Sequence, residues 1–520
     1  MSRIELRAAM TTAVAALLLG GCNVGPKYQK PPAMAQAPPA TYKESPGPAQ
    51  PTNSSPSNTT GAHAADAGEW KVAQPQDAML KGKWWEIYQD ADLNALEEKL
   101  AIDNQTIKQY FANFMEARTL VAEVRSQLYP TVTTGPSYSR TQTSGHVGSA
   151  APSAAVGKQA NLFELPVDAS WVPDLWGRVR NQIRAEQYNA QISAADMEGE
   201  RLTEQSGLAE YFFEIRGQDA LAAIYNQTVA DDQKELDYTR AQYDTGVGTE
   251  ISVVEAENTL QNAQAVLINL GVARAQYEHA IAVLIGTDPS SFSIPVKTLN
   301  AAPPPVPIGV PSQLLERRPD IAASERTMAE ANAQIGVARA AFYPNLTLSA
   351  DGGFESSVFG HLLDWSSRFW SVGPGVSESI YDGGLRRATV NQYIETYNAD
   401  VAGYRQTVLT AFQQVEDALA TERILSQQIA QQQLAVQSAQ RFIELETSRY
   451  ETGVDPYIDV VTAQETLLVD RQTLTTLHTQ VMTASVQLIQ ALGGGWDSTQ
   501  LPTPEQVSKK LSPGETTIQR

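Results

Sequence analysis

The chain has 520 residues, and its 38 Lys and Arg against 58 Asp and Glu give a formal net charge of −20. This acidity argues against a nucleic-acid-binding protein, which needs a basic surface, and favours either a solubilising surface or an acidic lumen that attracts cations. One cysteine excludes internal disulfides and cysteine-based zinc sites, and the five histidines lack metal-ligand spacing, so we expect no metal.

Residues 1–21 have the pattern of a secretory signal peptide, because Arg3 and Arg7 precede a short apolar run that ends in small residues. Cys22 follows directly and resembles the lipid-modified first residue of mature bacterial lipoproteins; the alternative is an unmodified cysteine. By the same resemblance, Asn23 points to the outer membrane. A lipid on Cys22 would anchor the chain without spanning the bilayer. Residues 22–82 are rich in Pro, Ala, Ser and Thr and predict a tether.

Residues 83–300 form the first predicted structural repeat. A helix from about 92 to 128 ends before Tyr129-Pro130, since proline disfavours helix in the preceding residue. Strands follow at 131–140 and 161–171, and then long helices at 178–243 and 251–285. In the second strand apolar and polar residues alternate, which fits either a half-buried strand of a soluble sheet or a strand that crosses a bilayer. Trp171 and Trp176 lie where an interfacial aromatic girdle would be.

Residues 301–499 repeat this plan and are followed by a polar tail at 500–520. After a proline-rich linker we expect a helix at 312–342, strands at 345–354 and 370–381, and long helices at 384–450 and 457–492. Trp370 is the third predicted interfacial aromatic residue, and Glu378 breaks the alternation of its strand without an evident reason. A seven-residue apolar period along the third long helix indicates a coiled-coil seam.

The two repeats share one turn sequence. Gly246 and Gly453 stand 207 residues apart, each between the end of a long helix and the start of an apolar one. Glycine just past a helix supplies the left-handed backbone that ends it. The sequence therefore predicts an internal two-fold repeat with two helical hairpins, whose tips are these turns.

The stretch Leu314-Leu315-Glu316-Arg317-Arg318-Pro319-Asp320 closely resembles the signature of the outer-membrane factors, the TolC-like ducts of bacterial efflux and secretion systems. The residues from Cys22 to Tyr28 and Trp84-Trp85 resemble its NodT-like and OprM-like lipoprotein branch, and the match extends to about Gly495. The resemblance implies a mainly α protein with a transmembrane β-barrel, in which a homotrimer closes a 12-stranded barrel and a 12-helix periplasmic duct.

The resemblance also implies the partners and the work of the protein. These are outer-membrane lipid, a periplasmic membrane-fusion adaptor, and an inner-membrane pump of the RND type or of the ABC or MFS type. The duct would conduct substrates passively across the outer membrane, with no cofactor other than the lipid on Cys22.

In this family the hairpin tips form the closed gate and dock the adaptor. The implied docking residues are Thr245, Gly246, Val247, Thr452, Gly453 and Val454. The candidate gate residues are Asp455, Asp459 and Tyr450, because acids around a threefold axis would repel one another and attract cations. Tyr450 matches the family tyrosine, whereas Asp455 stands where the TolC prototype has arginine, and Thr462 where it has a second aspartate. Both aspartates could instead be ordinary acids at a helix N-terminus.

Two other classes of function compete with the duct. The sequence contains no catalytic set and no phosphate-cradling loop, which argues against an enzyme. A lipid-anchored periplasmic coiled-coil scaffold or adaptor without a pore would explain the helices and Cys22. It would not explain four alternating strands or the signature around Arg317 and Arg318.

Overall fold

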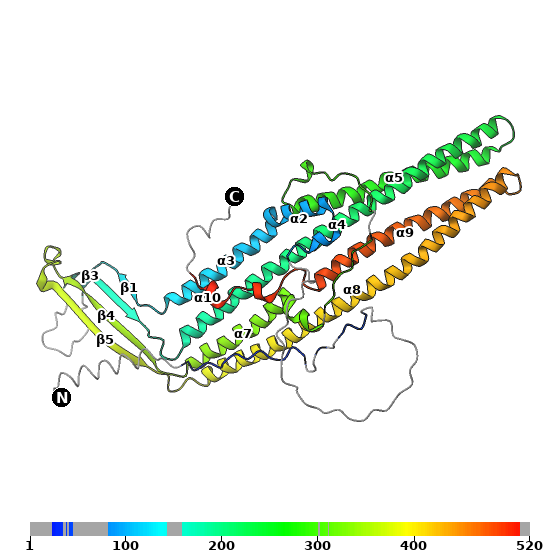
Figure 1. Ribbon diagram of the computed structural model, residues 1–520. Helices are drawn as coiled ribbons and strands as arrows, with labels where there is room; N and C mark the ends of the chain where they lie inside the picture. The colour runs from blue at the N-terminus through cyan, green and yellow to red at the C-terminus, as the bar shows by residue number, and fades with distance from the viewer. Residues whose placement is uncertain are drawn as a thin grey trace, which may run out of the picture.

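The computed structural model describes residues 23–34, 38, 41–44, 82–142, 159–299, 302–309 and 311–509. Cys22 and the predicted signal peptide lie outside this range. The described chain is elongated, with a β-sheet at one end and two helical hairpins that reach the other (Figure 1). None of its described helices combines the length and the apolar character needed to cross a membrane.

Two hairpins of equal dimensions make up most of the molecule. The first pairs α4 (Arg178–Asp244) with α5 (Glu250–Leu284), and the second pairs α8 (Leu385–Glu451) with α9 (Tyr457–Ala491). The outgoing helices have 67 residues each and the return helices 35, so the outgoing helices are about 100 Å long. Because α4 also packs on α9, the four helices form a layer in the order α5, α4, α9, α8.

Shorter helices precede the strands of each repeat. They are α2 (Ala91–Asp103), α3 (Gln105–Ser126), α6 (Leu314–Arg317) and α7 (Pro319–Ala340). The single helices predicted at about 92–128 and 312–342 are therefore wrong, since each is interrupted. Asn104 starts α3 by accepting a hydrogen bond from the Ile107 amide at 2.9 Å. Pro319 keeps Arg318 in an extended conformation and begins α7.

The two interruptions are equivalent joints. Asn104 Nδ2 donates to the Leu284 carbonyl at 2.9 Å, and Arg318 Nη1 donates to the Ala491 carbonyl at 2.9 Å. Each side chain thus ties the start of a short helix to the last turn of a return helix. In addition, α4 contacts α3 and α7, and α7 contacts α8. Four helical rows therefore run from the sheet to the tips. Two rows are the single helices α4 and α8, the third is α3 followed by α5, and the fourth is α7 followed by α9.

The sheet is open and antiparallel. Its strands are β1 (Thr131–Thr134), β2 (Ser137–Gln142), β3 (Gln159–Trp171), β4 (Asn345–Ser356) and β5 (Arg368–Ser377). Both β1 and β2 pair with one side of β3, β4 pairs with the other side of β3, and β5 pairs with β4. The predicted strand 131–140 is therefore two strands, separated at Gly135-Pro136, because proline cannot donate to a strand ladder. The predicted strand 370–381 is too long, since β5 ends just before Glu378, which explains the broken alternation there.

The register gives the sheet one apolar and one polar face. An apolar row crosses four strands at Val132, Ala169, Ala350 and Val372. The adjacent row is polar and consists of Thr133, Asp168, Asp351 and Ser371. No described residue in the five strands is buried within the protomer. The sheet therefore has no core of its own in a single copy of the chain.

The main core lies midway along the molecule, where η1 (Trp84–Tyr88), α2 and the end of α5 pack on α4 and α9. Trp84 is 1% exposed and Phe212 is 1% exposed. The remaining short elements are η2 (Pro289–Ser291), η3 (Pro311–Gln313), η4 (Phe359–His361), η5 (Trp365–Ser367), η6 (Ser498–Gln500) and α10 (Pro504–Val507). The predicted polar tail is ordered at its start, where buried Val507 packs beside α3 and α4.

The described parts of the tether lie along the helices. The Tyr28 hydroxyl donates to Glu325 Oε1 of α7 at 2.9 Å. Tyr42 is buried, and the Lys43 and Glu44 amides donate to the Glu416 carboxylate of α8 at 2.8 and 3.0 Å. The tether is thus fixed to both α7 and α8.

Candidate functional site

The two hairpin tips have the same backbone closure. In the first, Gly246 has φ +76° and its amide bonds to the Tyr243 carbonyl at 2.9 Å, while the Val247 amide bonds to the Gln242 carbonyl. In the second, Gly453 has φ +74° and repeats the first bond to Tyr450 at 2.9 Å. These bonds satisfy the last carbonyls of α4 and α8, and glycine tolerates the left-handed backbone that they require.

Threonine hydroxyls reinforce both closures. Thr245 Oγ1 donates to the Ala241 and Gln242 carbonyls at 3.0 and 2.9 Å. Thr452 Oγ1 donates to the Ser448 and Arg449 carbonyls, both at 3.0 Å. Among the predicted docking residues, the threonines and glycines therefore shape the turns. The valine side chains are exposed.

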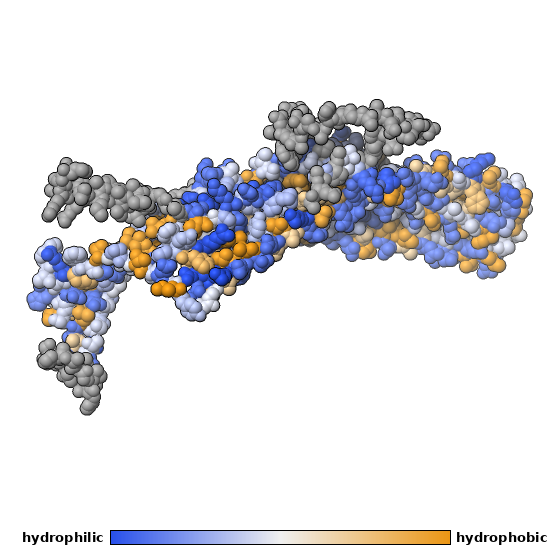
Figure 2. Space-filling model, turned by 90° about the horizontal axis from the view of Figure 1, so that it is seen from below, coloured by the Kyte–Doolittle hydropathy of each residue, from blue (hydrophilic) through white to orange (hydrophobic). Residues whose placement is uncertain are grey.

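The outermost side chains of both tips are apolar. Val247 is 80% exposed and Val454 is 65% exposed. Ile251 and Ile458, in the first turns of the return helices, are also exposed. The space-filling view shows hydrophobic side chains at this end of the molecule and again near the junction of sheet and helices (Figure 2). Each tip thus offers a small apolar surface.

A charged cluster lies at the second tip. Carboxylate oxygens of Glu446, Asp455 and Asp459 lie within 4.8 Å of one another. Arg449 forms a two-pronged ion pair with Asp455, in which Nη2 lies 3.0 Å from Oδ1 and Nε bonds to Oδ2. The spacing of the three acids would suit a cation, but Arg449 already occupies Asp455.

The cluster shifts the titration of its members. The hydrogen bond from Arg449 lowers the pKa of Asp455. Desolvation, followed by the charge of Asp455, raises the pKa of Glu446. Arg449 and Glu446 are the residues that sequence reasoning missed. The missed signal is positional, because the turn at Gly453 brings Arg449 back to Asp455 six residues later.

Tyr450 connects the hairpins instead of joining the acids. Its hydroxyl donates to Gln242 Oε1 of the first hairpin at 2.9 Å. Its ring centroid lies 5.5 Å from that of Tyr457 in a tilted arrangement. Gln242 is the counterpart of Arg449 in the first repeat, at the same offset of 207 residues. The structure therefore separates the three candidate gate residues into an acidic cluster and a tyrosine link.

Asp455 and Asp459 could both be ordinary acids at a helix N-terminus, but only Asp459 has that position. Asp459 lies in the first turn of α9, where a negative charge is favoured by the helix dipole. Asp455 precedes the N-cap residue Pro456 and pairs with Arg449. Asp459 therefore has a local structural role in a single protomer, whereas Asp455 braces the turn.

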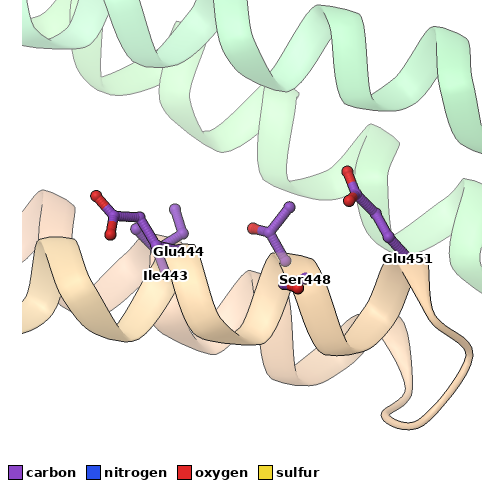
Figure 3. Close-up of a pocket in the computed structure, with 5 residues that line it drawn as sticks. Ile443, Glu444, Ser448 and Glu451 are labelled. Carbon is purple, nitrogen blue, oxygen red and sulfur yellow. The ribbon is translucent and has the colours of Figure 1, made fainter.

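A shallow groove borders the cluster on α8. It has a volume of about 360 Å³ and is lined by Ile443, Glu444, Thr447, Ser448 and Glu451. Figure 3 shows the Glu444 and Glu451 side chains projecting from α8. The side of α8 that lines this groove is thus polar and acidic.

The three predicted interfacial tryptophans lie around the sheet. Trp171 pairs with Leu348 at the helical end of β3, and its Nε1 donates to the Leu128 carbonyl at 2.9 Å. Trp176 stacks on Tyr343 and donates to the Pro344 carbonyl at 2.8 Å. Trp370 pairs with Gly352, further from the helices, and is 76% exposed. Trp176 therefore holds the junction together, and Trp370 projects from the apolar face.

The sequence matches the family model described as outer membrane efflux protein at residues 96–287 and 310–494, well over half of the chain. The chain belongs to the outer membrane efflux protein family. This confirms the resemblance seen at the Arg317-Arg318-Pro319-Asp320 signature.

Individual relatives agree with this assignment. The chain is 27% identical over 488 residues to the probable efflux pump outer membrane protein TtgC of Pseudomonas putida, covering 94% of this chain and 95% of TtgC. It is 28% identical over 496 residues to the outer membrane protein OprJ of Pseudomonas aeruginosa, covering 93% and 95%. The solved outer-membrane channel OprN has the same fold, with a TM-score of 0.78 at 24% identity, covering 91% of this chain and all of that one.

These comparisons decide between the competing functional classes. The family and its relatives are outer-membrane efflux components and channels rather than enzymes. The protein is accordingly an outer-membrane efflux protein with a large helical portion, and the scaffold without a pore is not supported.

Proposed function

We propose that three copies of this chain form one continuous duct across the outer membrane and the periplasm. The observation that carries this proposal is the open sheet. It has one apolar face, two unpaired edges formed by β1 with β2 and by β5, and no buried residue. An open sheet edge cannot face lipid, because its backbone groups would lack hydrogen-bond partners.

Head-to-tail association would satisfy those edges. The edge of β5 in one copy would pair with the edge of β1 and β2 in the next, and cyclic symmetry would close the ring. If β1 and β2 are counted as one strand, because both pair with β3, each copy supplies four strands and four helical rows. Three copies then give a 12-stranded barrel over a 12-helix duct. The apolar rows would face lipid and the polar rows the lumen, with Trp171 and Trp370 in the aromatic girdles.

The helical edges support the same arrangement. On α5, Ile268 is 77% exposed and Val272 is 55% exposed. On α8, Ile424 is 52% exposed and Leu434 is 54% exposed. Since α5 and α8 are the two outer rows of the layer, these side chains would be covered where α8 of one copy meets α5 of the next.

The lipid and the partners complete the proposal. A lipid on Cys22 would hold the N-terminus in the outer membrane, and the contacts of Tyr28 and Tyr42 would carry the chain from there along α7 and α8. A periplasmic adaptor would dock on the tips around Val247 and Val454. The adaptor would connect the duct to an inner-membrane pump of the RND type, or of the ABC or MFS type, which supplies the energy.

The gate is proposed at the second tip. Asp455 and Asp459 of three copies would surround the threefold axis, with Arg449 bracing Asp455 and with Tyr450 tying each second hairpin to the first. The test is the double variant Asp455→Ala with Asp459→Ala, measured as conductance in planar bilayers and as vancomycin entry into cells. Both should increase. The control is Asp244→Ala, an acid near the first tip and outside the cluster, and unchanged values in both assays for the double variant would remove these aspartates from the gate.

A further inference from the structure

One side of α4 forms a stripe that faces the second hairpin below the tips. Its members recur at spacings of three and four residues and are Tyr225, Val229, Asp232, Leu236 and Thr239. Leu236 packs in one cluster with Tyr457 and Val461 of α9, and Val229 borders that cluster. The Tyr225 hydroxyl accepts a hydrogen bond from Gln472 of α9. Asp232 is thus a carboxyl group in the middle of the packing surface between the hairpins.

Asp232 is buried there without a compensating cation. It is 7% exposed, and its Oδ2 has no hydrogen-bond partner among the described residues. The titratable groups around this part of the interface are Asp231 and Glu235 on α4, Glu255 on α5, Tyr450 on α8, and Tyr457 and Arg471 on α9. Lys234 bonds to Asp231 at 3.0 Å, and Arg471 likewise interacts with Asp231.

This environment favours the protonated carboxyl group. Burial, followed by the charges of Asp231 and Glu235, raises the pKa of Asp232 to about 6. Burial also raises the pKa of Tyr457, with Glu235 and Asp232 adding to the effect. A buried carboxylate without a partner is costly, whereas the neutral acid is tolerated in an apolar contact.

We propose that Asp232 is a proton-dependent switch between the two hairpins: protonated Asp232 permits α4 to pack on α9, and ionised Asp232 favours their separation near the tips. When the hairpins separate, water reaches the carboxyl group and its pKa returns to an ordinary value of about 4. The packed state therefore binds the proton more tightly, and packing is strongest below about pH 4, weakens up to about pH 6 and stays constant above.

The size of the effect follows from the two pKa values. A difference of about two pH units changes the packing equilibrium about 100-fold between the acidic and the neutral limit. If the tips form the gate, stronger packing of the hairpins in acid would favour the closed duct. This effect on the duct rests on the proposed function, whereas the change in hairpin packing does not.

The experiment is amide hydrogen exchange on the full-length protein in mild detergent from pH 4 to pH 8, corrected for the intrinsic exchange rate at each pH. The segments to follow are 225–243 and 457–467. In the wild type the opening equilibrium should increase up to about 100-fold between pH 4 and pH 6 and then level off. Asp232→Asn should remove this dependence and stay protected at pH 7. Asp237→Asn, on the exposed side of the same helix and hydrogen-bonded to Gln233, should behave as the wild type.

Two results would overturn the switch. One is a wild-type profile that does not change with pH, and the other is an Asp232→Asn profile that still follows the wild type. Asp232→Leu, which completes the apolar stripe, is the second variant and should also lose the pH dependence. Bilayer conductance of the same samples separates the two proposals. If exchange follows pH in the expected way while conductance does not, the switch stands and the assignment of the gate to these tips fails.

Discussion

Replacing Asn104 by Ala should loosen the joint between α3 and the first hairpin. Asn104 is 3% exposed, its Oδ1 caps α3 at the Ile107 amide, and its Nδ2 donates to the Leu284 carbonyl and to Glu204, each at 2.9 Å. Loss of an N-cap side chain costs about 1 kcal/mol. Loss of the bond to the Leu284 carbonyl costs about 1 kcal/mol more. The expected decrease in local stability is therefore about 2 kcal/mol, a roughly 30-fold increase in opening.

Hydrogen exchange at the start of α3 and the end of α5 measures this opening directly. The matched control is Asn262→Ala, because Asn262 lies on the exposed face of α5 and its recorded side-chain bond is to Asn258. The control should change exchange at the joint by less than threefold. If Asn104→Ala behaves like the control, Asn104 does not hold α3 on α5. The similar hydrogen bond of Arg318 would then be no evidence that the two joints stabilise the helices in the same way.

Three further changes test other parts of the account. Arg449→Gln should remove the counter-ion of Asp455 and raise cation conductance in planar bilayers at low salt, with the difference shrinking at high salt as screening increases; an equal effect at all salt concentrations would contradict an electrostatic origin. Because Arg449 lowers the pKa of Asp455, their ion pair should persist below the ordinary pKa of aspartate and be lost only as the pH falls through the lowered value, which leaves Arg449 as an unpaired cation; cation conductance should therefore fall at a lower pH in the wild type than in Arg449→Gln. Val372→Lys should reduce the heat stability of the assembled barrel seen on gels, because Val372 lies in the apolar row and lysine facing the bilayer costs up to about 2–4 kcal/mol towards its midplane. Ser371→Lys on the polar face should not reduce it, and equal losses would mean that the faces are assigned wrongly.

The helical hairpins could be predicted closely because their boundaries are local. Glycine closes both tips, and α4, α5, α8 and α9 each begin and end within one residue of the predicted bounds. The breaks at Asn104 and Arg318 could not be located in the same way. Their side chains bond to carbonyls about 180 residues away, so the reason for each break is tertiary.

The candidate site was only partly predictable for a similar reason. The repeated turns identify the tips, but the pairing of Arg449 with Asp455 depends on how the chain crosses the turn at Gly453. Asp232 could have been noticed from its spacing between Val229 and Leu236, which places an acid in an apolar stripe. Its burial depends on α9, a segment more than 200 residues further along the chain.

The most direct test of the central claim is the native mass of the mature protein, extracted from membranes in mild detergent. The account predicts a homotrimer that requires detergent, because the apolar face of the sheet must be covered and its edges must pair between copies. A folded, water-soluble monomer or dimer, obtained when Cys22 is replaced by Ala, would contradict the shared barrel and the duct that depends on it.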